Sequence, residues 1–451
     1  MSSPMITGST SYFDLSRLVT TSFPDFIDTS LSELLPPINT ATFIFFILYL
    51  KYHSYIINTN ISFKFYFVNT ICYTTTIAIY HTLNEIILDS SALVHNFNYF
   101  QKLNPATQVC PVLKSNAYGH GLVEIAKIVD RHLQTPYIMV DSLFEAYELL
   151  KQKIKTPIMI MGYTDPQNYS VWKKLPFTFT VYDIDSLKAL NEHQPGAKVH
   201  LKLDTGMCRL GIQKENVSEF ISVLKTCRHL QIEGIYSHLS EADDPRKITF
   251  TNNQIKLFKV MVTEFEKAGF TFKYKHIAAT AGASIIRDPY FNLVRLGLGF
   301  YGYTPFGPHT IEGRTQKQIL HPALTFTSRL ALIKNIRSGD QVGYEGTYTA
   351  KQDETIAILT AGYNEGIPWG LSNQVDFLIQ NTKCPVVGNI SMNMTTIKIP
   401  RTINVKIGDQ ATIISPNSDD PCSVYKLAAT LHTLPYTILT GLHSTIRRTI
   451  L

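Results

Sequence analysis

The chain has little charge and no long uninterrupted apolar run. Charged residues make up 17% of its 451 residues and hydrophobic residues 45%, a balance typical of a folded protein rather than a disordered one. The net charge is only +6, and the positive residues are scattered without a basic run that would suit a phosphate backbone. The composition therefore gives no support to a nucleic-acid partner.

Cysteines are few, and their spacing excludes two common kinds of site. No two of them form a CxxC pair, and none lies at a zinc-site spacing from histidines, so we expect no metal ion. Scattered cysteines of this kind favour a reducing compartment, which predicts a cytoplasmic protein with buried, inert thiols. The six cysteines are Cys72, Cys110, Cys208, Cys227, Cys384 and Cys422.

The amino-terminal region lacks a convincing membrane span. The apolar stretch from Ala41 to Leu50 covers about ten residues, whereas a spanning helix needs about 20. A second stretch, Tyr66 to Tyr80, is diluted by an asparagine and three threonines. The basic start and early apolar core of a signal peptide are also missing. We interpret residues 1–77 as a non-catalytic extension, either a poorly ordered segment or translated upstream sequence that is not part of the mature protein, with a weak membrane hairpin as the alternative.

Strand and helix patterns alternate from Ile79 to about residue 321. This alternation indicates parallel βαβ units, and about eight units predict a closed (β/α)8 barrel over residues 78–321. An open doubly wound sheet is the alternative, but no GxGxxG follows the first strand. The predicted strands are 109–113, 136–141, 157–162, 177–182, 198–203, 232–237, 276–279 and 293–298, and the predicted helices are 122–132, 143–153, 168–175, 184–192, 217–230 and 254–269.

After Pro322 the pattern changes to strands separated by turns. The pairs Gly339-Asp340 and Gly408-Asp409 are loop or hairpin signals between these strands. We therefore expect a second, β-rich domain over residues 322–451. Its predicted strands are 324–335, 354–360, 375–379, 395–399 and 410–415.

The most informative residue is Lys114, which ends the predicted strand 109–113 and precedes a polar, glycine-containing loop. Barrel enzymes place catalytic groups at the carboxyl ends of their strands. A lysine buried there loses its charge readily and can form a Schiff base. Lys114 is therefore a candidate Schiff-base lysine, with a structural lysine whose stem packs along the strand end as the alternative.

This loop and a series of later motifs resemble the alanine racemase family, in family order from about Ile79 to Arg448. The resemblance implies a barrel followed by a β domain, pyridoxal phosphate (PLP) as cofactor, and interconversion of L-alanine and D-alanine that supplies peptidoglycan synthesis. The motifs that carry it are Val112-Leu113-Lys114-Ser115-Asn116-Ala117-Tyr118-Gly119-His120-Gly121 and the segments 200–211, 236–238, 276–278, 294–297, 342–344, 361–363, 391–392 and 434–436.

The resemblance also implies two catalytic bases. Lys114 would carry the cofactor aldehyde and act on the D-isomer side, and Tyr344 would act on the L-isomer side. A racemase needs one such group on each face of a planar carbanion, because a single base would return the proton to the same face. His238 would contact the tyrosine. Arg295 would face the pyridine nitrogen, and because arginine only donates hydrogen bonds it would leave that nitrogen unprotonated.

Further site residues follow from the same resemblance. Arg209 and the backbone amide of Met392 would bind the substrate carboxylate, and Lys202 matches a lysine that is often carbamylated. The residues matching Tyr344 and Met392 reach the other subunit's cofactor, which implies a homodimer with shared active sites. The phosphate would be held by Tyr118, Thr280, Gly297, Leu298 and Tyr436.

Three positions depart from the family pattern: Ala279, Glu345 and Asn393 stand where the family commonly has asparagine, glycine and aspartate. These changes bear on rate and substrate preference more than on reaction class. The alternatives that stay open are a racemase of another small amino acid such as serine, a related PLP barrel decarboxylase, and a non-enzymatic PLP-binding barrel protein.

Overall fold

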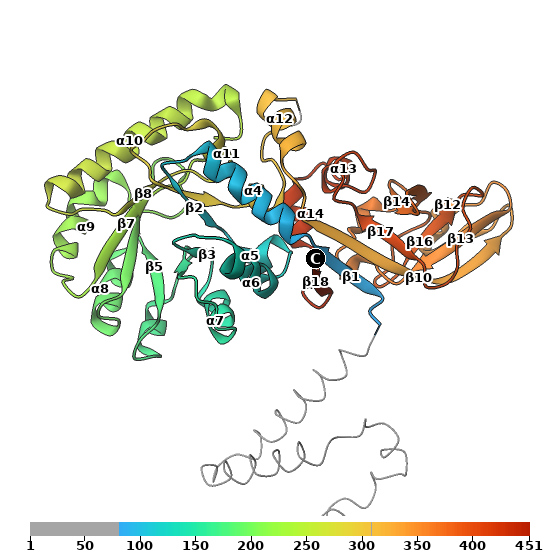
Figure 1. Ribbon diagram of the computed structural model, residues 1–451, viewed down its shortest axis with the longest axis horizontal. Coiled ribbons are helices and arrows are strands. Elements are labelled where there is room, and N and C mark those ends of the chain that lie inside the picture. Colours follow the sequence, from blue (N-terminus) through green and yellow to red (C-terminus); the bar gives the residue numbers. More distant parts are fainter. Residues whose placement is uncertain (1–80, 308) are drawn as a thin grey trace, which may run out of the picture. The chain divides into compact units, whose positions relative to one another are not determined.

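The computed structural model describes residues 81–307 and 309–451 (Figure 1). The chain divides into one unit over Met1–His81 and a second, compact unit over Thr82–Leu451. The interpretation of residues 1–77 as a non-catalytic extension lies outside the described residues. Within the described residues, no helix is both long and apolar enough to cross a membrane.

Eight parallel strands form a closed barrel in the first part of the second unit. Strands β3 to β8 make one sheet in sequence order, and β2 pairs with β9. Backbone hydrogen bonds join these two pieces. The N–H of Leu113 donates to the carbonyl of Met139 at 2.7 Å, and the N–H of Arg295 donates to the carbonyl of Ala278 at 3.0 Å. The predicted barrel is thereby confirmed. Its strands are β2 (Gln108–Pro111), β3 (Ile138–Val140), β4 (Ile158–Ile160), β5 (Phe177–Val181), β6 (Lys198–Lys202), β7 (Gln231–Tyr236), β8 (Tyr274–His276) and β9 (Leu293–Leu296).

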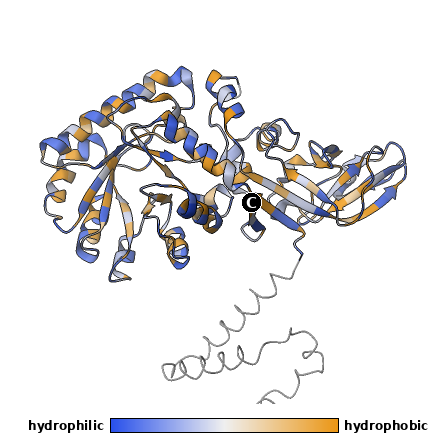
Figure 2. Cartoon of the chain, viewed as in Figure 1, coloured by the Kyte–Doolittle hydropathy of each residue, from blue (hydrophilic) through white to orange (hydrophobic). Residues whose placement is uncertain are grey.

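Helices around the barrel carry hydrophobic residues on one side and hydrophilic residues on the other (Figure 2). In α6 (Leu122–His132), for example, Leu122, Ile125 and Val129 are buried, at the i, i+3 and i+7 spacing of one helix face. The other helices of this part are α4 (Ser90–Leu103), α7 (Leu143–Lys151), α8 (Ile184–His193), α9 (Val217–Leu224), α10 (Ile248–Lys267), α11 (Thr280–Ile285) and α12 (Ile311–Ile319).

One predicted helix, over residues 168–175, is instead a short 3-10 segment, η1 (Pro166–Ser170). The reason is a competing hydrogen-bond partner. The side-chain amide of Gln194 donates to the carbonyls of Tyr169 and Trp172 at 2.6 and 2.7 Å, and its oxygen accepts from the N–H of Leu175 at 2.7 Å. These backbone groups are satisfied without a continuing helix.

The second part of this unit is β-rich, as predicted, and all five predicted strands are present. The main sheet has the order β15-β14-β17-β10-β1-β18, and β13 pairs with β10 and β16. A separate pair joins β11 (Gln341–Val342) to β12 (Tyr348–Thr349). The elements of the sheet and its two helices are β10 (Leu324–Ile336), β13 (Glu354–Leu359), β14 (Asp376–Ile379), β15 (Thr382–Pro385), β16 (Thr395–Ile399), β17 (Gln410–Ile414), β18 (Arg447–Ile450), α13 (Val424–Thr430) and α14 (Pro435–Thr440).

Strand β1 (Asn84–Leu88) belongs to this second sheet. It pairs antiparallel with β10, with Leu88 opposite Leu324, and parallel with β18, with Leu88 opposite Ile450. The sequence-based division at residues 78 and 322 counts these residues with the barrel. No strand was predicted over residues 84–88, and periodicity would in any case not show which sheet a strand joins, so this pairing had to come from the structure.

Candidate active site

A cavity of about 710 Å³ opens where the barrel strands end. Such a position, at the carboxyl ends of the strands, is where barrel enzymes carry their chemistry. Every predicted site residue except Tyr344 and Met392 lines it. Those residues are Lys114, Tyr118, Lys202, Arg209, His238, Thr280, Arg295, Gly297, Leu298 and Tyr436.

Lys114 is half-buried in this cavity and is followed by an unusual turn, labelled α5 (Lys114–Tyr118). The four residues from Ser115 to Tyr118 all have φ between 52° and 56°, in the left-handed region. For residues with a side chain this conformation costs roughly 1–2 kcal/mol each. Surrounding contacts must therefore hold the turn. One of them is the Asn116 side chain, which accepts the N–H of Leu122 at 2.9 Å and so ties the turn to the start of α6.

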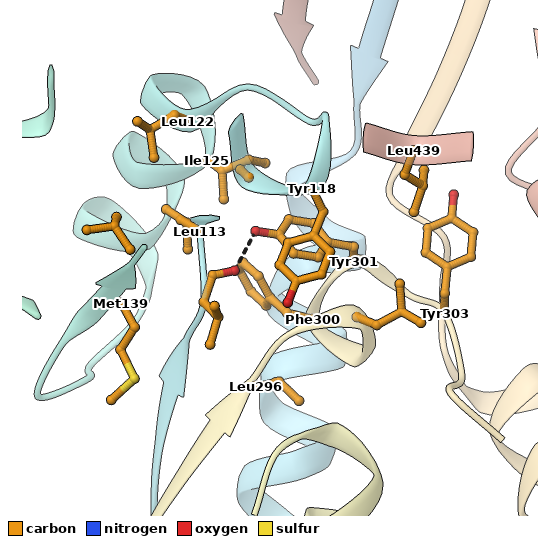
Figure 3. Packing of buried hydrophobic residues seen from close by; sticks show 14 of the residues in the cluster. Leu113, Tyr118, Leu122, Ile125, Met139, Leu296, Phe300, Tyr301, Tyr303 and Leu439 are labelled. Atoms are coloured by element: carbon orange, nitrogen blue, oxygen red, sulfur yellow. Dashed lines mark hydrogen bonds between the residues drawn. The ribbon is translucent and has the colours of Figure 1, made fainter. Parts of the chain in front are cut away.

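Tyr118 and Gly297 form one wall of the cavity. A Cβ added to Gly297 would lie 2.6 Å from the Tyr118 hydroxyl oxygen, so a residue with a side chain would fill this place. Burial raises the pKa of the Tyr118 phenol, which keeps the hydroxyl protonated and able to donate. The Tyr301 and Tyr436 rings pack at 5.0 and 6.0 Å from the Tyr118 ring. Figure 3 shows Tyr118 and Tyr301 in this packing.

Thr280 stands at the start of α11, next to this wall. Its hydroxyl oxygen accepts the N–H of Gly299 at 3.2 Å, and its own proton remains available to a ligand. Burial raises the pKa of Tyr436 to about 12, so this phenol also stays protonated at neutral pH. Hydroxyl donors beside a glycine backbone suit an anionic group such as a phosphate.

Arg295, on β9, is almost fully buried beneath the cavity. Its guanidinium donates to Nδ1 of His276 at 2.8 Å, to Nδ1 of His238 at 3.0 Å and to the carbonyl of Ser237 at 2.8 Å. Burial lowers the pKa of Arg295 to about 10, so the group stays charged at neutral pH. The cation is held by neutral acceptors alone, without a carboxylate partner in the described part of the chain.

These bonds fix the protonation of three histidines. Because arginine only donates, Nδ1 of both His238 and His276 must accept, which leaves the proton on Nε2 of each. Nε2 of His276 then donates to Nδ1 of His200 at 2.9 Å, and Nε2 of His200 is buried without a partner in the described chain. Burial, with the Arg295 charge next, lowers the pKa of His238 to about 3. His238 therefore presents a neutral ring with an N–H group.

Lys202, on β6, is also buried. Burial lowers the pKa of its amine to about 8, and the charges of Arg295, Arg209 and Lys114 act in the same direction. A larger fraction of the amine is then neutral at physiological pH, which is the nucleophilic form that carbamylation requires. Arg209 is exposed on the loop after β6.

Tyr344 and Met392 lie away from the cavity, in the second domain. Their exposed fractions are 72% and 56%, high values for large hydrophobic residues. Tyr344 begins the short segment η5 (Tyr344–Gly346), in which Glu345 takes a left-handed φ of 62°. The side chain of Asn389 holds this segment by donating to the Tyr344 carbonyl at 3.2 Å and to the Glu345 carboxylate at 3.3 Å. A single chain thus does not bring Tyr344 to Lys114.

Sequence reasoning missed several residues that line the cavity, among them Asp141, Tyr163 and Asp243. Asp141 ends the predicted strand 136–141 and Tyr163 follows the predicted strand 157–162, so a search of the carboxyl ends of the predicted strands would have found both. Asp243 lies in the longer loop after β7, where no local pattern marks it. Ala279, one of the departures from the family pattern, also lines the cavity.

Comparisons with known proteins agree with this arrangement. The family described as "Alanine racemase, N-terminal domain" matches residues 88–305, and "Alanine racemase, C-terminal domain" matches residues 323–450. The alanine racemase of Desulforamulus reducens is 32% identical over 368 residues, which cover 80% of this chain and 97% of the relative. That of Symbiobacterium thermophilum is 30% identical over 365 residues, covering 80% and 95%.

The chain belongs to the alanine racemase family. Solved structures agree: the alanine racemase of Clostridium difficile 630 superposes with a TM-score of 0.76 at 28% identity, over 82% of this chain and 96% of that one. The alanine racemase of Bacillus anthracis with bound L-Ala-P gives 0.75 at 26% identity, again over 82% and 96%. The alanine racemase family consists of amino-acid racemases that use PLP. The cavity fits that cofactor, because it joins a lysine, a donor-only guanidinium and a wall of hydroxyls that a Cβ on Gly297 would obstruct.

Proposed function

We propose that this protein is a PLP-dependent alanine racemase that interconverts L-alanine and D-alanine with two bases. The observation that supports this most directly is the pairing of Lys114 with Arg295 in one cavity, together with the wall formed by Tyr118 and Gly297. PLP, when bound, acts as an electron sink that makes the Cα proton of an amino acid acidic. Lys114 would hold its aldehyde, and Tyr118, Thr280, Tyr436 and the backbone at Gly297 and Leu298 would hold its phosphate.

Arg295 would influence the reaction because it is unable to donate a proton to the cofactor. A guanidinium donates hydrogen bonds but gives up no proton, so with PLP bound Arg295 would donate to the pyridine nitrogen and leave it unprotonated. The cofactor would then withdraw electrons less strongly, which would suppress side reactions such as transamination. The related decarboxylases typically use a glutamate at this place, so Arg295 favours racemisation over decarboxylation.

Protons would move at Cα on two opposite faces. Lys114 serves the D-isomer side, and Tyr344 of the partner subunit serves the L-isomer side. His238 lines the cavity and keeps a neutral N–H group, which would contact that tyrosine. Arg209, with the backbone amide of Met392 from the partner subunit, would bind the substrate carboxylate, and a carbamate on Lys202 would orient Arg209 by turning a like-charge neighbour into an attractive one.

The active unit that this requires is a homodimer with shared sites. The exposure of Tyr344 and Met392 supports it, because a group of exposed large apolar side chains marks a surface that contacts another protein. The exposed large hydrophobic residues of the second domain include Tyr344, Tyr363, Trp369, Met392 and Met394. We further propose that the D-alanine serves cell-wall peptidoglycan.

One assay tests the proposal: purified protein is incubated with L-alanine, with and without added PLP, and D-alanine is measured by chiral chromatography. We expect D-alanine formation that depends on PLP, and parallel incubations with L-serine should react more slowly. Faster racemisation of serine would assign the protein to serine instead. Release of carbon dioxide without D-amino acid would favour the decarboxylase alternative, and PLP binding without turnover would favour a non-enzymatic role.

A further inference from the structure

We propose that Glu145 is a positioning residue, which holds the peptide unit after Lys114 and thereby directs this lysine into the cavity. The carboxylate makes two backbone contacts. One oxygen accepts the N–H of Ser115 at 2.6 Å, and the other accepts the N–H of Asp141 at 2.9 Å. The inference deepens the proposed function and rests on it for its catalytic consequence.

The local sequence suggests that Glu145 takes part in a capping box at the start of α7. Ser142 is the N-cap of α7, and a glutamate three residues later normally bonds back to the N–H of the capping residue. Here the Ser142 hydroxyl does accept the N–H of Glu145 at 3.2 Å. The carboxylate, however, goes to Asp141 and across to Ser115, 30 residues earlier in the chain. It therefore acts on the lysine loop rather than only on its own helix.

The hydrogen bond from Ser115 to Glu145 lies at the point where the backbone enters the left-handed conformation. The N–H of Ser115 belongs to the peptide unit between Lys114 and Ser115, so its direction sets the ψ of Lys114 and the φ of Ser115. That φ is 56°, the first of the four left-handed residues. A charge-assisted hydrogen bond is among the stronger contacts available to resist the strain there.

On its other side Lys114 is held as well. The N–H of Leu113 donates to the carbonyl of Met139, in the middle of β3, at 2.7 Å. Glu145 follows β3 in the same βα unit, so one unit of the barrel brackets Lys114 from both sides. A lysine side chain has four flexible carbon–carbon bonds, and a fixed backbone direction limits where its amine can go.

The test compares Glu145→Ala, which removes both contacts, and Glu145→Gln, which keeps one acceptor oxygen, with two matched controls. Ser142→Ala removes the cap of α7 and leaves the carboxylate. Glu148→Gln removes a charge on the same helix, from a residue that pairs with Lys151 at 2.6 Å. All are measured in the full chain.

The first readout is amide hydrogen exchange of residues 113–121 in the PLP-free protein. We expect exchange of the turn to rise about tenfold in Glu145→Ala and less in Glu145→Gln, with both controls near wild type. The second readout is PLP affinity, which should fall about tenfold in Glu145→Ala. In the same variant kcat should fall, and it should change by a larger factor than the KM for alanine.

Two results would overturn the proposal. Ser142→Ala loosening the turn as much as Glu145→Ala would trace the effect to the cap of α7. Glu145→Ala lowering the melting temperature while leaving turn exchange and PLP affinity unchanged would show a merely structural residue. If Glu145→Ala does not fold, Glu145→Gln decides by the same readouts. Failure of the wild type to bind PLP would refute the proposed function, whereas the exchange measurement would still decide the contact.

Discussion

Replacing Gly297 by alanine should weaken cofactor binding through a single steric clash. The new Cβ would lie 2.6 Å from the hydroxyl oxygen of Tyr118 and 3.3 Å from its ring carbon Cζ. Ordinary contact needs about 3.5 Å or more, so the hydroxyl must retreat by about 1 Å. The Tyr118 ring has little freedom to do so, because Tyr301 packs against it at 5.0 Å and is itself bonded to the carbonyl of Val112 at 2.9 Å (Figure 3).

The loss of PLP affinity can be estimated from the small freedom of the Tyr118 ring to move. Overpacking of a closely packed site costs typically about 1–3 kcal/mol. If the strain is relieved by moving the Tyr118 hydroxyl away from the phosphate, PLP affinity should fall by roughly 5-fold to 150-fold. Gly307→Ala is the matched control, because a Cβ there would meet nothing within 4 Å.

The measurements are PLP titration by fluorescence quenching and thermal unfolding of the PLP-free protein. We expect Gly297→Ala to lose stability and affinity, and Gly307→Ala to keep both. Adding Tyr118→Phe to Gly297→Ala removes the clashing oxygen, so stability should return while affinity stays low, because a phosphate contact is now missing. A double variant no more stable than Gly297→Ala would refute the argument, since the clash would then not be the cause.

Four further outcomes are expected. Borohydride should fix the cofactor on Lys114, as shown by peptide mapping, and attachment at another lysine would exclude the assigned role. The Tyr344→Phe variant should lose racemisation but still bind PLP. Mixing Tyr344→Phe chains with Lys114→Ala chains should restore about one working site per mixed dimer. No recovery of activity after confirmed subunit exchange would exclude the shared site. The free energy of unfolding should fall as the pH drops below about 6.5, because burial lowers the pKa of His200 to about 3 and that of His120 to about 4 in the folded chain. Between these values and pH 6.5 only the unfolded chain takes up protons, so each histidine contributes up to about 1.4 kcal/mol per pH unit. Urea unfolding at stepped pH measures this dependence, which should weaken in His120→Gln. A chain starting at residue 78 should bind PLP and racemise alanine at the full-length rate, and a folded, dimeric but inactive product would make residues 1–77 part of the enzyme.

Patterns along the sequence predicted the parts of the fold that depend on local periodicity. Alternating strands and helices gave the barrel, and a change to strands with turns gave the β-rich domain. The helix predicted over residues 168–175 was wrong, since the side chain of Gln194 replaces helical hydrogen bonds there from a distance. Helix α9 ends at Leu224 instead of continuing to residue 230. Strand β1 was not predicted, and its pairing with β10 and β18 was not predictable from local patterns because it depends on residues far along the chain.

For the candidate site, sequence comparison supplied residue identities but not their physical state. Lys114 and Arg295 stand in recognisable motifs, so their presence in one cavity could be anticipated. The neutral form of His238 could not, because it follows from Arg295 donating to its Nδ1. The left-handed turn was equally hidden, since residues such as Ser115 and Ala117 avoid that conformation unless tertiary contacts impose it.

The pairing of β1 with β10 and β18 also constrains how the chain assembles during synthesis. β1 is made before the barrel, β10 only after it, and β18 after every other strand, so the sheet has a very high contact order. Ser90, which follows β1, bonds to a residue 361 positions later. The barrel can therefore fold during synthesis while β1 is still unpaired, and an unpaired strand is open to pairing with other chains. A change that makes the β1 edge less prone to pair with other chains should therefore raise the folding yield without altering the finished sheet.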